Sequence, residues 1–226
     1  SGGEPVVFGR TQGYTGILID DLITKGTDEP YRMFTSRAEF RLHLRVDNAD
    51  ERLTEVGRKV GLVEDDRWEL LLKKREQKAR LADLFARVRL DAGTFPQIDL
   101  PADDRPMVAQ WLKRPEASID TISDWIIQEL GEEPARGLLT TLQTEIKYEG
   151  YIAQQERQIR RLRDAEARQI PDGFSYEGIP GLSLEVVEKL KRVGPRSLGQ
   201  AGRIPGVTPA AVAVLDCYLN LCRQSA

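Results

Sequence analysis

The chain has 226 residues, of which 40% are hydrophobic and 31% charged, and its formal net charge is −3. This composition excludes wholesale disorder, and the length suits one large domain or two small ones. No run approaches the roughly 20 apolar residues that cross a bilayer, and residues 1–4 lack the basic and apolar regions of a signal peptide. The overall charge excludes a basic nucleic-acid coat protein, although 33 Lys and Arg residues can still gather on local surfaces.

Few residues are suited to metal or nucleophilic chemistry. His43 is the single histidine, so a His-based metal site or a Ser-His-Asp triad is not expected. Cys217 and Cys222 lie in one predicted helix, and we expect two free, buried thiols in a reducing, cytoplasmic compartment. No G-x-G-x-x-G, Walker or G-x-S-x-G motif is present, so the residues predict neither a dinucleotide site nor nucleotide hydrolysis.

Three adjacent acidic pairs are Asp20-Asp21, Asp65-Asp66 and Asp103-Asp104. Neighbours in sequence do not face one site, which makes paired acid–base chemistry unsuited to them. We expect Asp65 or Asp66 to cap one helix and Asp103-Asp104 to cap the next, because the helix dipole favours negative charge at the N-terminus. Asp20-Asp21 follows an apolar run, and both a structural role and a site role stay open for it.

The first predicted elements are ambiguous. Residues 13–25 fit a short helix or a buried strand. Residues 35–45 alternate like a half-buried strand, but Ser36 followed by Glu39 is a capping box, which favours a helix starting at Arg37. In either form Arg37, Arg41 and Arg45 would share one face, because steps of four suit both periods.

The rest of the chain predicts an all-α fold, because strand signals are scarce after residue 60. Helices are expected over 48–60, 65–90, 106–113 and 119–129, with a proline-rich loop over 91–106. One uninterrupted helix is expected from Pro134 to about Gln169, since no proline interrupts it. The residues expected to face inward include Leu53, Val56, Val60, Trp68, Leu71, Leu72, Leu81, Leu84 and Phe85.

The second half of that long predicted helix carries Arg157, Arg160, Arg161 and Arg163, and its middle carries an aromatic pair. Tyr148 and Tyr151 flank Gly150, and a mid-helix glycine costs about 1 kcal/mol relative to alanine. This cost predicts the close approach of another helix or a partner. Core packing and a partner-binding face both remain open for the two tyrosines.

An internal repeat follows a linker over 171–182. Ile179-Pro180-Gly181 and Ile204-Pro205-Gly206 each open the pattern I-P-G-h-[S/T]-x-x-x-V-x-x-L, at an offset of 25 residues (204 − 179). Each copy predicts a tight turn, an N-cap at Ser183 or Thr208, and a helix. Such turns resemble helix-hairpin-helix modules that hold nucleic-acid backbones, although Ser183 and Thr208 replace the usual second glycine.

Two clusters of cations are candidates for binding phosphate. Arg32, Arg37, Arg41 and Arg45 oppose Glu39 alone over residues 31–45, and arginine forks match phosphates. An ion-paired surface is the alternative. Lys191, Arg192 and Arg196 lie near the repeat turns, where Gly181 and Gly206 precede helix N-termini that can bind anions.

Several segments together resemble one family. They are RTQGYTGILIDDLITKGT (10–27), EPYRMFTSRAEFRLHLRVDNADERLTEVGRKVGL (29–62), IKYEGYIAQQ (146–155) and GLSLEVVEKLKRVGPRSLGQAGRIPGVTPAAVAVL (181–215). This set is similar to the glucose-inhibited division protein A family (MnmG), the flavoprotein subunit of the complex that modifies the tRNA wobble uridine. The resemblance implies a C-terminal region downstream of the flavin fingerprint and of the catalytic cysteines, inactive by itself.

The same resemblance implies cofactors and partners for the whole protein. It would bind FAD, use a reduced nicotinamide and a methylene-folate donor, form a homodimer, and act with the GTPase MnmE on carbon 5 of uridine 34. For this chain it implies no bound cofactor and three parts: 1–62 as the tail of the flavin domain, 63–170 as a helical bundle, and 171–226 as a small helical subdomain.

The resulting expectation is a binding module. Arg32, Arg37, Arg41 and Arg45 would contact the tRNA backbone. Partner or tRNA contact is expected from Gly181, Lys191, Arg192, Arg196, Gly206, Tyr148 and Tyr151. The alternative is a protein-interaction bundle that never touches RNA.

Overall fold

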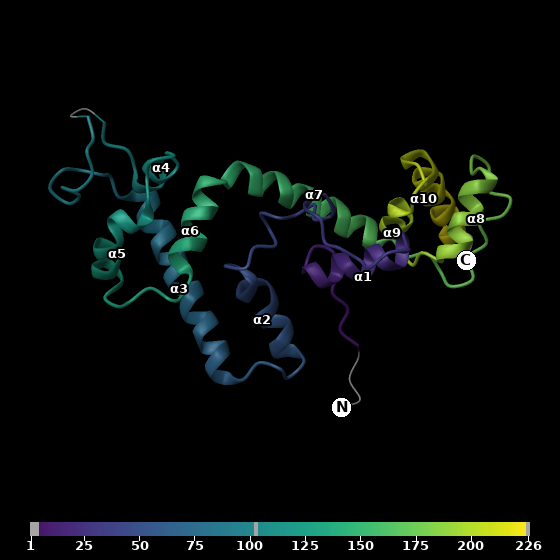
Figure 1. Cartoon of the computed structure of the whole chain (residues 1–226), viewed down its shortest axis with the longest axis horizontal. Coiled ribbons are helices and arrows are strands. Elements are labelled where there is room, and N and C mark those ends of the chain that lie inside the picture. The colour runs from purple at the N-terminus through teal and green to yellow at the C-terminus, as the bar shows by residue number, and fades with distance from the viewer. Residues whose placement is uncertain (1–4, 102–103, 225–226) are drawn as a thin grey trace. The chain divides into compact units, whose positions relative to one another are not determined.

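A computed structural model describes residues 5–101 and 104–224, with side chains described up to residue 221. Every regular element within those ranges is a helix (Figure 1), which confirms the all-α fold. The expectations for residues 1–4, for Asp103 and for the Cys222 side chain fall outside the described residues. No helix among the described residues is long and apolar enough to cross a membrane.

The chain forms two compact units, one built on Leu44–Ala153 and the other on Pro5–His43 with Gln154–Ala226. The domain boundaries expected after residues 62 and 170 remain a prediction.

The Leu44–Ala153 unit contains α2 (Ala49–Lys59), α3 (Asp65–Arg87), α4 (Val108–Leu112), η2 (Ile119–Ile122), α5 (Ser123–Leu130) and α6 (Leu138–Lys147). The long α3 packs against α4, α5 and α6. Its buried side joins a core that includes Phe85, Trp111, Ile126 and Leu138. Val60 and Leu72 are exposed, so their predicted inward positions are wrong.

The other unit contains α1 (Tyr14–Thr24), η1 (Thr35–Arg37), α8 (Leu184–Val193), α9 (Leu198–Arg203) and α10 (Pro209–Gln224). In this unit α1 and α10 both pack against α9, and α8 lies beside α10 in Figure 1. Its core is made by residues such as Tyr176, Leu190, Ile204 and Leu215. The helix alternative for residues 13–25 is therefore the correct one.

The predicted uninterrupted helix from Pro134 to Gln169 is wrong. Gly137 takes a left-handed φ of 77° and α6 begins only at Leu138. Tyr148, with ψ of 18°, separates α6 from α7 (Glu149–Ala167). Tyrosine and glycine both have low helix propensity, so a helix is most easily interrupted at Tyr148–Gly150.

Four smaller expectations also need correction. A Cβ at Gly150 would meet nothing within 4 Å, so the predicted close approach is absent from the described residues. Cys217 is exposed rather than buried. Asp104 accepts a hydrogen bond from Arg114 at 2.6 Å, while the residue that precedes α4 is Met107. The residue that precedes α3 is Glu64, with Asp65 and Asp66 in the first turn.

Candidate nucleic-acid interface

The interface is organised by a buried ion pair between Arg10 and Asp21. Arg10 is 4% exposed and Asp21 is 1% exposed. Arg10 Nη1 lies 2.8 Å from Asp21 Oδ1 and 3.0 Å from Asp20 Oδ2. The loop that carries Arg10 passes close to α1, because a Cβ at Gly16 would overlap the Gly9 carbonyl. The absence of a side chain at Gly16 thus allows Arg10 to reach the acids of α1.

The second fork of the Arg10 guanidinium holds a later segment. Arg10 Nη2 donates to the Glu39 carboxylate at 2.7 Å and to the Arg37 carbonyl at 3.2 Å. This bond explains why the predicted helix starting at Arg37 is wrong. The acid of the expected capping box, Glu39, binds Arg10 instead, and residues 39–43 form turns after the short η1.

Asp21 anchors the N-terminal end of the same segment, at Tyr31. Its carboxylate accepts hydrogen bonds from Lys25 Nζ at 3.0 Å and from the Tyr31 hydroxyl at 2.9 Å. Burial opposes ionisation of Asp21, but the bonds from Lys25, Tyr31 and Arg10 outweigh it and lower the pKa of the carboxyl. Burial and the bond to Asp21 raise the pKa of the Tyr31 hydroxyl. Both groups therefore keep their hydrogen-bonded protonation states at neutral pH.

The segment held in this way is the 31–37 loop (Tyr31–Arg37), where arginines and aromatic rings interleave. The Arg37 guanidinium carbon lies 4.8 Å from the centroid of the Tyr31 ring and 5.6 Å from that of Phe34. The Arg32 guanidinium carbon lies 5.6 Å from the Phe34 centroid. Arg32 and Arg41 are exposed and have no ion pair within the described ranges. These cations can therefore meet an external anion.

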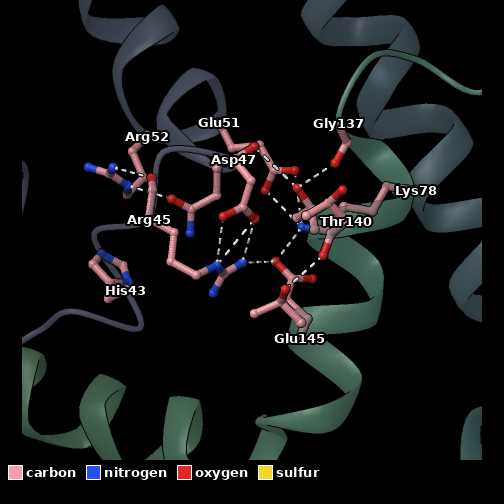
Figure 2. Close-up of polar contacts among 12 residues, drawn as sticks. His43, Arg45, Asp47, Glu51, Arg52, Lys78, Gly137, Thr140 and Glu145 are labelled. Atoms are coloured by element: carbon pink, nitrogen blue, oxygen red, sulfur yellow. Dashed lines mark hydrogen bonds and ion pairs between the residues drawn. The ribbon is translucent and has the colours of Figure 1, made fainter. Parts of the chain in front are cut away.

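Arg45 has a different environment from the other predicted arginines. It belongs to the Leu44–Ala153 unit, and its side chain is 12% exposed. Figure 2 shows its guanidinium between Asp47, at 3.1 Å, and Glu145, at 3.8 Å. Burial disfavours ionisation of Asp47, but the bond from Arg45 outweighs it and lowers the pKa of Asp47. The expected shared face of Arg37, Arg41 and Arg45 is wrong, because no regular helix or strand joins them.

A lysine completes the network around Arg45. Lys78 Nζ lies 2.8 Å from Glu51 and 2.8 Å from Glu145, so it links α2, α3 and α6 (Figure 2). These contacts hold the turn that carries Arg45 against the helices of its own unit. The role of Arg45 in the structure is therefore to stabilise packing.

The two repeat turns have matching geometry. Gly181 and Gly206 have φ of 91° and 90°, a region that favours glycine. The Ser183 hydroxyl accepts from Val186 N at 3.3 Å and the Thr208 hydroxyl from Ala211 N at 3.2 Å, so both predicted N-caps are confirmed. The predicted turn and helix of each copy are also present.

The two copies support each other reciprocally. A methyl group at Gly181 would touch Val214 of α10, and one at Gly206 would overlap Lys189 of α8. Val214 and Lys189 are themselves separated by the repeat offset, so equivalent positions exchange contacts across the pair. This is the pattern of an approximate two-fold axis.

The remaining predicted residues lie on exposed surfaces. Lys191 is ion-paired to Glu177, whereas Arg192 and Arg196 are exposed with no ion pair among the described residues. Tyr148 is 46% exposed and Tyr151 is 65% exposed, with ring centroids 6.5 Å apart. Core packing of the two tyrosines is therefore wrong, and the partner-face alternative remains for them.

Sequence reasoning missed Arg10, Tyr31 and Phe34. The available signal was Asp20-Asp21 beside an apolar run, because two acids next to a buried helix face need a cation. Asp20 also binds Arg203 of α9, at 2.7 Å and 2.8 Å. No group of His, Cys, Asp and Glu side chains among the described residues could hold a metal ion.

These features define a class: an all-helical domain with a duplicated turn-helix unit and an exposed arginine–aromatic loop. Residues 65–156 match the family described as the tRNA modifying enzyme MnmG/GidA C-terminal helical domain. Residues 158–226 match the corresponding C-terminal helical bundle. The chain belongs to the MnmG/GidA family, as part of its C-terminal region.

Individual relatives agree with this assignment. The tRNA uridine 5-carboxymethylaminomethyl modification enzyme MnmG of Syntrophotalea carbinolica is 48% identical over 96% of this chain and 35% of its own length. The MnmG of Thermodesulfovibrio yellowstonii is 44% identical over 93% of this chain and 34% of its own length. Aquifex aeolicus GidA, in its form II crystal, superposes with a TM-score of 0.78 at 34% identity, covering 96% of this chain and 34% of that one. The chain thus spans about a third of the relatives it matches.

Proposed function

We propose that this chain is the tRNA-contacting and partner-docking region of an enzyme that modifies carbon 5 of the wobble uridine. The names of the relatives support the reaction class. The observation that carries the proposal is the set of exposed arginines on and beside the 31–37 loop, which the buried Arg10–Asp21 pair holds in place. Arginine forks bind phosphate oxygens, the commonest contact in nucleic-acid complexes.

The chemistry itself belongs to other residues of such an enzyme. Asp21 is committed to Arg10, Lys25 and Tyr31 and is unsuited to acid–base catalysis. FAD and the reduced nicotinamide would bind in the part of the relatives that this chain does not match. The whole protein would be a cytoplasmic homodimer.

The GTPase subunit MnmE is the second proposed partner. Each unit offers it a separate surface: one has the repeat turns with the cations Arg192 and Arg196, and the other has the exposed aromatic rings of Tyr148 and Tyr151. Aromatic residues and arginine are enriched at protein interfaces.

Neutralising the loop arginines tests the tRNA assignment. The triple variant Arg32→Gln, Arg37→Gln, Arg41→Gln should lower the affinity of the 226-residue chain for bulk tRNA by about 10-fold or more, because three phosphate contacts are lost. Fluorescence anisotropy measures this affinity. The matched control is the variant Arg87→Gln. Arg87 is an exposed arginine of α3, in the Leu44–Ala153 unit, where it pairs with Asp83 of the same helix, and its loss should leave the affinity for tRNA unchanged.

A second candidate function is a protein-interaction bundle that never touches RNA. The exposure of Tyr148 and Tyr151 favours it. If a folded triple-arginine variant bound tRNA with unchanged affinity, the protein-interaction function would be favoured. Calorimetric titration with the GTPase subunit would then measure the binding that this function requires.

A further inference from the structure

Phe34 is an aromatic ring displayed on a charged surface. Half of the side chain is exposed, at 50%, and its neighbour Met33 is 38% exposed. Single exposed apolar residues are common on proteins, but two guanidinium groups lie near this ring, those of Arg32 and Arg37, each 5.6 Å from its centroid. Arginine and aromatic side chains together are the groups on which unpaired bases stack.

The backbone beneath the ring is held from both sides. Arg37 N donates to the Phe34 carbonyl at 3.0 Å, and Phe34 N donates to the Arg32 carbonyl at 3.1 Å. The Tyr31 hydroxyl is bonded to Asp21, and the Arg37 carbonyl to Arg10. A platform that is ordered before binding loses little conformational entropy when a ligand arrives.

The space beside the ring suits a base better than a phosphate. A pocket of about 420 Å³ is lined by Asp28, Glu29, Tyr31 and Phe34, with Arg32 and Arg37 among its other residues. The two carboxylates would repel a phosphate placed among them. They can accept hydrogen bonds from the amino groups on base edges, while the arginines bind the flanking phosphates.

We propose that Phe34 stacks on an unpaired RNA base, with Arg32 and Arg37 binding the phosphates on either side of that nucleotide. This inference rests on the proposed tRNA-binding function and adds to it: the loop would distinguish single-stranded RNA from paired RNA. A duplex buries the faces of its bases and offers only phosphates to the same residues.

The test compares two RNA probes with the 226-residue chain. Phe34→Leu should lower the affinity for a short single-stranded oligouridine about 10-fold, since loss of one stacked base weakens binding by about that factor or more. The affinity for a fully paired RNA duplex should not change. Met33→Leu is the matched control, and it should bind both probes like the parent chain.

A second variant makes the test independent of any effect on folding. Phe34→Trp keeps a ring, so it should retain affinity for oligouridine, and the emission of the new tryptophan should be quenched by that probe and not by the duplex. Equal oligouridine binding by Phe34→Leu and the parent chain would overturn the stacking assignment, while the triple-arginine variant would still report on the proposed function. Absence of RNA binding by the parent chain would overturn both.

Discussion

One buried guanidinium links three segments that are distant in sequence. Arg10 bonds to the acids of α1, to the Glu39 carboxylate and to the Arg37 carbonyl. Burying a charge is costly unless it is paired, and removing one partner of a buried pair leaves that cost uncompensated. Asp21 is therefore important for stability as well as for the position of the 31–37 loop.

Asp21→Asn should reduce the free energy of unfolding by about 3 kcal/mol near neutral pH, since Arg10 then keeps a buried charge with fewer counter-charges. Urea denaturation at equilibrium measures the change. Lys25→Gln removes the exposed partner of the same carboxylate and should cost less than about 1 kcal/mol. Equal losses in the two variants would contradict the importance of burial.

The difference between the parent chain and Asp21→Asn should depend on pH with a definite sign. The pKa of Asp21 is lowered in the folded state, so its stabilising effect is complete above the unfolded value of about 3.9. The effect is lost as the pH falls through the lower folded value. The two unfolding free energies should therefore converge only below about pH 4.

At the scale of elements, sequence reasoning succeeded where the deciding contact is local. Ser183 and Thr208 cap helices with bonds to residues three positions later, so the printed pattern contains both partners. The all-α class followed from the scarcity of strand signals after residue 60, which is also a local property of the sequence. In each unit, the core is formed by apolar residues that recur at helical spacing.

The errors arose where a distant residue decides. Ser36 and Glu39 have the spacing of a helix start, but Glu39 is bound by Arg10, which lies 29 positions earlier. The position of Arg45 depends on Glu145, 100 positions later (145 − 45). A single sequence gives no sign of such partners, so the shared face expected for Arg37, Arg41 and Arg45 was wrong, while their contact with tRNA stays a prediction.

Two glycines should respond in opposite ways to alanine. Gly206→Ala should destabilise the chain by more than about 1 kcal/mol, because its φ is positive and a methyl group would overlap Lys189. Gly150→Ala should stabilise it by about 0.5–1 kcal/mol, because Gly150 lies in α7 with open space around it. Thermal unfolding followed by circular dichroism measures both. A loss of stability in Gly150→Ala would reveal a close contact at that position.

At the scale of the whole molecule, the net charge of −3 hides an uneven distribution. Three acids near the arginine–aromatic loop contact Arg10, namely Asp20, Asp21 and Glu39, whereas Asp28 and Glu29 line the pocket beside Phe34. Arg32 and Arg41 have no ion pair among the described residues, so under the proposed function they would be available to an external polyanion. Local pairing, and not the total charge, would then set the affinity for RNA.

Salt should reveal how many phosphates are bound. The affinity of the 226-residue chain for tRNA should fall as salt rises, and the slope of log K against log salt should be shallower by about 2–3 in the triple-arginine variant, at about 0.7–0.9 per phosphate contact. Anisotropy titrations over a series of salt concentrations measure the slope. Identical slopes would mean that the loop arginines contact no phosphate.

The reciprocal support of the two repeat turns has a consequence for synthesis in the cell. A nascent chain emerges from the ribosome with its N-terminal part first, and the first turn, at Gly181, is complete only when Val214 has arrived. Until then Val186 and Leu190 of α8 lack the residues of α10 with which they share a core in the finished protein, Ala211, Leu215 and Leu219. The duplicated unit can therefore assemble only after α10 has been synthesised, and a ribosome that stops before α10 would release a chain that quality-control proteases can recognise.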